Sequence, residues 1–164
     1  MFPLIRKQNE SIAIGFVLFR FLEAAVITIG ILSVLALLTL SQEFVAAGAP
    51  DIASLQAAGT LLKAIHDWTF LLGLNFLLGI STIMYSYLLY KSKLVPQMIS
   101  VWGIIGSILI MAAGLLQMFA IIVPLSTWVA ILAIPVATYE MILAVWLIVR
   151  GFNESALASG SAKA

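Results

Sequence analysis

Residues 128–150 read WVAILAIPVATYEMILAVWLIVR and contain one charged side chain, Glu140, before Arg150 ends the run. A helix needs about 20 apolar residues to cross a hydrocarbon core of about 30 Å. This stretch is long enough, and irregular backbone is too costly in lipid, so it predicts a transmembrane helix over 128–149. Three similar apolar runs precede it, at about 12–40, 68–90 and 97–122.

The composition of the whole chain agrees with a membrane protein. Of its 164 residues, 63% are hydrophobic and 9% are charged, whereas soluble domains have about half and about a quarter. A net charge of +1 leaves no basic surface for nucleic acid. There is no cysteine, and His66 is the single histidine, so thiolate chemistry is excluded and a two-histidine metal or haem site would need a second subunit. We expect no metal, no other cofactor and no nucleic-acid partner.

The distribution of basic residues predicts the orientation in the bilayer. The loop over 41–67 contains Lys63 as its single basic residue, whereas six basic residues flank the other ends of the predicted helices: Arg6, Lys7, Lys91, Lys93, Arg150 and Lys163. The positive-inside rule then places both termini in the cytoplasm. The predicted fold class is all-α, an integral membrane four-helix bundle with up-down-up-down topology.

Two segments lie outside the predicted spans. Residues 50–67 begin with Pro50 and have apolar residues at helical spacing, which predicts a short amphipathic helix on the outer membrane surface, either separate or running into the next span. Residues 153–164 are small and polar and predict a flexible cytoplasmic tail, so that 1–152 form a single transmembrane domain. A cleavable signal peptide is disfavoured because the first apolar run is about twice the usual length and contains Arg20 and Glu23.

Three ionisable residues fall inside the predicted spans, where charge is expensive and usually functional or paired. At 1.5 Å per residue, Arg20 and Glu23 lie about 12 and 16 Å beyond residue 12, and Glu140 lies about 15 Å from Arg150. All three should therefore sit at one height, with Arg20 held between the two carboxylates. The same arithmetic adds four more side chains to this predicted intramembrane polar cluster: Ser81, Thr82, Ser107 and Tyr139.

The polar cluster has two interpretations. It fixes helix register through a buried ion pair, which is the commoner role of such clusters, or it binds an ion, proton or substrate. Glu140 is the more informative residue, because Arg20 could reach the interface if the membrane begins near residue 21. An unpaired Glu140 would be neutral and available for proton coupling, whereas Glu140 paired with Arg20 would stay ionised and inert.

A stripe of small residues marks the third predicted helix. Small residues at such spacings allow a neighbouring helix to approach closely, either within the chain or in a homo-oligomer or with another membrane subunit. The stripe consists of Ser100, Gly103, Ser107 and Gly114. The sequence contains no nucleophile-base-acid set, Walker loop or dinucleotide fingerprint, so we predict no catalytic residues.

Several segments resemble one family of bacterial membrane proteins, known as domain of unknown function 4386. They are FPLIRKQNE (2–10), FRFLEA (19–24), LLYKSKLVP (88–96) with Gly103 following, and the end from Glu140 to WLIVRGF (146–152). The similarity covers nearly the whole chain, and the turn motif with Tyr90, Ser92 and Pro96 recurs in order with the Glu140 helix end. The resemblance implies that Arg20 and Glu23 also occupy motif positions. It also implies a longer six-helix form, relative to which this chain would lack two leading helices.

The resemblance implies a multi-pass protein of the bacterial inner (plasma) membrane but supplies no activity. We therefore expect a structural or interaction component of that membrane, whose partner is the lipid bilayer. The alternative is a small carrier or proton-coupled protein that uses Glu140 with Arg20 as its counter-charge. An enzyme is the least favoured class, because few catalytic groups could gather at one water-accessible face.

Overall fold

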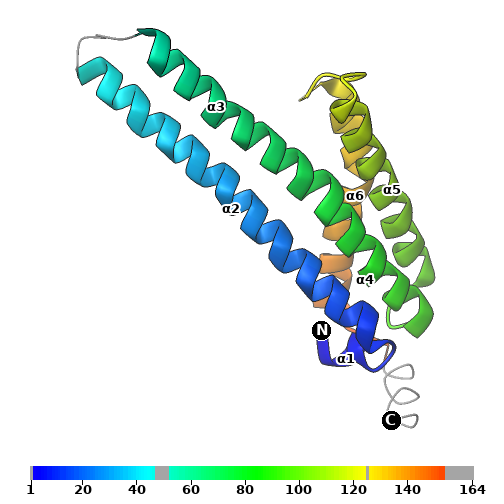
Figure 1. Ribbon diagram of the computed structural model, residues 1–164. Coiled ribbons are helices and arrows are strands. Elements are labelled where there is room, and N and C mark those ends of the chain that lie inside the picture. The colour runs from blue at the N-terminus through cyan, green and yellow to red at the C-terminus, as the bar shows by residue number, and fades with distance from the viewer. Residues whose placement is uncertain (1, 47–51, 125, 154–164) are drawn as a thin grey trace.

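The computed structural model describes residues 2–46, 52–124 and 126–153, and each secondary-structure element in them is a helix (Figure 1). In chain order these are α1 (Phe2–Arg6), α2 (Glu10–Ala46), α3 (Ile52–Leu71), the π-helix η1 (Leu72–Leu77), α4 (Leu78–Ser92), α5 (Gln97–Met118) and α6 (Thr127–Val149). Four helical stretches are long and apolar enough to cross a membrane: Glu10–Ala46, Ala53–Ser92, Gln97–Met118 and Thr127–Val149. The predicted all-α fold with four membrane-length helices is confirmed, and the chain is a multi-pass membrane protein.

The helices form two antiparallel hairpins of unequal length. α2 packs along α3, η1 and α4, while α5 packs on α4, η1 and α6. The 37 residues of α2 correspond to about 55 Å and the 23 residues of α6 to about 35 Å. In Figure 1 the long α2–α3 hairpin leans away from α5 and α6, and the two hairpins meet at the end of the molecule that holds α1. α4 is thus the helix that joins them.

The segment between the first two spans follows one of the two predicted alternatives, the helix that runs directly into the next span. Residues 52–92 form one continuous helical run, in which the six π-helical residues of η1 shift the register without a break. No proline interrupts this run, and its first turns pack on α2, with Gly59 beside Leu37. The helix therefore continues the axis of α4 and does not form a separate connector over 50–67. Residues 50 and 51 of that prediction lie outside the described residues.

Helix α5 ends at Met118, four residues before the predicted end. The N–H of Ile121 bonds the carbonyl of Leu116 at 2.9 Å, and the N–H of Ala120 bonds that of Gln117 at 3.0 Å. Ala120 has a φ of 54°. These bonds and the left-handed residue define a Schellman ending. The prediction was too long because an alanine occupies the position at which glycine usually marks such an ending.

The best-packed region lies where the two hairpins meet. Ile5 of α1 is buried there beside Leu88 and Leu89 of α4, together with Tyr139 and Leu143 of α6. The short helix α1 was not predicted, because five residues carry too little periodic signal. Its burial means that the N-terminal segment belongs to the bundle and closes its lower end in Figure 1.

The small-residue stripe of α5 faces other helices of the same chain. A Cβ atom on Gly103 would collide with Ser86 and Tyr139, and one on Gly114 would lie 2.8 Å from the side chain of Asn75. Ser100 and Ser107 are fully buried. The stripe thus packs against α4, η1 and α6, and an oligomer contact would have to use another surface.

Candidate functional site

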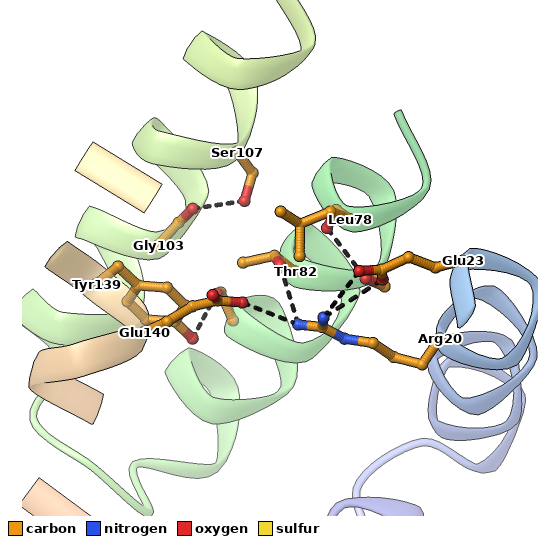
Figure 2. A network of polar contacts seen from close by, with 10 residues as sticks. Arg20, Glu23, Leu78, Thr82, Gly103, Ser107, Tyr139 and Glu140 are labelled. Atoms are coloured by element: carbon orange, nitrogen blue, oxygen red, sulfur yellow. Dashed lines mark hydrogen bonds and ion pairs between the residues drawn. The ribbon is translucent and has the colours of Figure 1, made fainter. Parts of the chain in front are cut away.

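Arg20 of α2 lies between two carboxylates from different helices (Figure 2). Its Nη1 donates to Oε1 and Oε2 of Glu23, one turn along the same helix, at 3.4 and 3.3 Å. Its Nη2 donates to Oε1 of Glu140, on α6, at 3.2 Å. The arrangement is the one expected from the equal depths of the three residues in the sequence.

A third helix completes the surroundings of the guanidinium. Nη2 of Arg20 also lies 3.5 Å from Oγ1 of Thr82 on α4, and the guanidinium carbon lies 5.9 Å from the ring centre of Phe16 on α2. Phe16 in turn stacks on Tyr85 with ring centres 5.1 Å apart. Arg20 therefore links α2, α4 and α6 through polar contacts, although α2 and α6 pack mainly on other helices.

The three charged side chains differ in burial. The side chain of Glu23 is 11% exposed, that of Arg20 35% and that of Glu140 45%. Because these residues lie within membrane-length helices, their charges are costly unless they are paired. The site holds two carboxylates for one guanidinium, so its formal charge is −1 when both carboxylates are ionised.

The remaining predicted members of the polar cluster do not contact Arg20. Oγ of Ser107 donates to the carbonyl of Gly103 at 2.7 Å (Figure 2). Oγ of Ser81 donates to the carbonyl of Leu78 at 3.0 Å. Both hydroxyls are thus satisfied by the preceding turn of their own helix, as serine commonly is inside helices. They share the height of the charged residues without joining their network.

Tyr139 makes a different contact from the one expected. The Oγ of Ser86 on α4 donates to the phenol oxygen of Tyr139 at 2.8 Å, and both side chains are buried. This bond ties α6 to α4 beside the Arg20 cluster. Ser86 was missed by the depth argument, but it follows Thr82 by one helical turn, and that spacing was the signal that could have indicated it.

Replacement of Tyr139 by Phe should lower the free energy of unfolding by about 1–2 kcal/mol, because the buried Ser86 hydroxyl loses its acceptor. Tyr87 on the same helix as Ser86 is 44% exposed, and Tyr87→Phe should change the stability by less than about 0.5 kcal/mol. Unfolding in detergent, followed by circular dichroism, measures both. Equal effects of the two variants would contradict a structural role for the Ser86 bond.

The predicted turn motif forms a compact loop at the same end as α1. Oγ of Ser92 donates to the carbonyl of Leu89 at 3.2 Å, and Lys93 ends α4 with a φ of 54°. Pro96 is the residue before the first turn of α5, whereas Tyr90 is 41% exposed. The motif thus reverses the chain between α4 and α5, and Tyr90 points away from the packed interior.

The chemistry open to this site is electrostatic. Within residues 2–46, 52–124 and 126–153, no three His, Asp or Glu side chains gather as a metal site would require. His66, the single histidine, lies on α3 with Nδ1 3.3 Å from the carbonyl of Gly30 and its ring against Phe70. It is therefore engaged in packing α3 on α2, away from the charged cluster.

Neither curated proteins nor solved structures give a match to this chain. One family model matches it over residues 1–151, a range that includes Arg20, Glu23, Glu140 and the α4–α5 turn. The match therefore covers all four membrane-length helices. The chain belongs to the family described as Domain of unknown function (DUF4386).

Proposed function

We propose that this protein is a non-enzymatic structural or interaction component of the bacterial inner membrane, in which the Arg20 cluster fastens the two helical hairpins together. The observation that carries the proposal is that one guanidinium contacts Glu23 on α2, Thr82 on α4 and Glu140 on α6. The contact with Glu140 joins the two hairpins and is lost if they move apart, whereas Glu23 and Thr82 hold the guanidinium in place within the first hairpin. A paired, hydrogen-bonded charge of this kind specifies one arrangement of helices more than it adds stability.

The proposed orientation places both termini in the cytoplasm. Basic residues support it, since Arg6, Lys93 and Arg150 lie at the end of the bundle near α1. Lys63 lies on α3, toward the opposite end, where it pairs with Asp67. Positive charge gathers on the cytoplasmic side of membrane proteins.

A second candidate function is proton coupling through Glu140. It is favoured by the excess of carboxylates over guanidinium groups and by the 45% exposure of the Glu140 side chain. Because Glu140 is partly exposed and the site carries excess negative charge, a proton can reach this carboxyl group without any rearrangement of the packed side chains. In this alternative Arg20 is the counter-charge of the ionised state.

Infrared difference spectroscopy distinguishes the two candidates, because it separates protonated carboxyl groups from carboxylates. The protein in lipid is titrated through neutral pH, and Glu140→Gln assigns any band that belongs to Glu140. Glu10→Gln is the matched control, since Glu10 pairs with Arg6 at the exposed start of α2. The structural proposal predicts that Glu140→Gln leaves the carboxyl bands through neutral pH unchanged and that vesicles containing the protein show no added proton flux.

The opposite result would contradict the structural proposal. A protonated carboxyl band that titrates near neutral pH, disappears in Glu140→Gln and remains in Glu10→Gln would establish Glu140 as a proton-binding group. Proton flux lost in Glu140→Gln alone would then assign the protein to the proton-coupled class.

A further inference from the structure

A basic cavity opens at the end of the bundle, between the α4–α5 turn and the end of α6. Its volume is about 380 Å³, and its walls include Lys93, Pro96, Gln97, Trp146, Arg150 and Asn153. The N–H of Asn153 bonds the carbonyl of Leu94 at 3.0 Å, which holds the chain after α6 against the turn. The walls of the cavity are therefore built from two separate parts of the sequence.

The cavity has the charge of an anion site. Lys93 and Arg150 line it, and neither forms an ion pair within the described part of the chain. Its wall also includes Pro96 and Gln97, the start of the 22-residue helix α5, whose first turn has no side-chain cap. The dipole of this helix adds to the attraction for a phosphate group.

An apolar groove lies beside this cavity and follows α6. The groove has a volume of about 450 Å³ and is lined by Met141, Ile142, Val145, Trp146, Val149 and Arg150. Trp146 and Arg150 border both spaces, so the two adjoin at these side chains. From Met141 to Arg150 the groove runs for about 14 Å along the helix, close to half of a hydrocarbon core of about 30 Å.

We propose that this composite site binds an anionic phospholipid, with the headgroup phosphate between Lys93 and Arg150 and one acyl chain in the α6 groove. The basic cavity alone would suit any phosphate. With the adjoining apolar groove, on a helix long enough to span the membrane, the composite site suits a ligand that is charged at one end and apolar at the other. Basic pockets between transmembrane helices recognise anionic headgroups in this way.

The test uses the purified full-length chain in mild detergent with equal amounts of phosphatidylglycerol and phosphatidylcholine, and native mass spectrometry counts the retained lipids. The wild-type chain should retain more phosphatidylglycerol than phosphatidylcholine. Lys93→Asn with Arg150→Gln should lower this preference about thirty-fold, since each cation near a headgroup contributes a factor of about five and the two factors multiply. Asparagine suits the left-handed backbone at position 93, so the turn is retained.

Two controls separate the site from general effects of charge and from a soluble anion. Lys63→Gln removes one positive charge at the distant end of the long hairpin and should leave the preference unchanged. Val145→Trp narrows the groove without changing the charge and should reduce retention of phosphatidylglycerol, while circular dichroism reports the folding of each variant. Equal retention of both lipids by the wild-type chain would overturn the proposal. So would undiminished preference in a folded double variant, or displacement of the lipid by an equal concentration of inorganic phosphate.

Discussion

Replacement of Arg20 by Met is expected to lower the free energy of unfolding by about 3 kcal/mol. The change leaves Glu23 and Glu140 as unpaired carboxylates inside a membrane-length bundle, and a buried pair that loses one partner costs about 3–5 kcal/mol. The lower end of that range applies because the Arg20 side chain is 35% exposed. Unfolding by denaturant in mixed micelles, followed by tryptophan fluorescence, measures the effect.

Lys63→Met is the matched control for Arg20. Lys63 also forms an ion pair, with Asp67 one helical turn further along α3. The side chain of Lys63, however, is 69% exposed. Exposed pairs contribute about 0–1 kcal/mol, so this variant should unfold nearly as the wild type does. If Arg20→Met were no more destabilising than Lys63→Met, the cluster would not hold the hairpins together.

Replacement of Gly106 by Ala is the second change with a large expected effect. A Cβ atom at position 106 would lie 2.7 Å from the backbone nitrogen of Val136 and 2.9 Å from the carbonyl carbon of Pro135. Backbone atoms of a helix cannot move aside as the end of a side chain can, so α5 and α6 must separate. Overpacking costs about 1–3 kcal/mol, and we expect the upper end of this range.

Gly59→Ala tests the same substitution where space allows it. The nearest atom to a Cβ there is Cδ1 of Leu37 at 3.5 Å, an ordinary contact. Alanine favours a helix over glycine by up to about 1 kcal/mol, so Gly59→Ala should be neutral or stabilising in the same unfolding assay. A similar loss of stability in both variants would mean that close packing at Gly106 is not responsible.

The long helices could be predicted because a membrane-spanning helix needs about 20 consecutive apolar residues, which can be counted in the sequence. Their ends could not, since the end of α5 depends on a left-handed alanine and the start of α3 lies in a segment that reads as amphipathic. Gly106 was missed because it lies outside the stripe through Gly103 and Ser107, and its importance comes from the α6 backbone beside it. The tail prediction over 153–164 falls, apart from Asn153, outside the described residues.

The charged cluster could be predicted from depth alone because the rise of a helix is constant. Arg20 and Glu140 have long side chains that reach beyond their own helices, so equal depth brought them into contact, while Glu23 meets Arg20 one turn along the same helix. Ser81 and Ser107 have the same depth but short side chains, which bond the preceding turn. Depth therefore predicts neighbours for long charged side chains and not for serine hydroxyls.

A double-mutant cycle between Arg20 and Glu140 tests the central claim most directly. The free energy of unfolding is measured for the wild type, Arg20→Met, Glu140→Gln and the double variant. A direct contact between α2 and α6 predicts a coupling energy of about 1 kcal/mol or more, because residues in one ion-pair network are not additive. Additivity within about 0.3–0.5 kcal/mol would contradict the claim that this ion pair fastens the two hairpins.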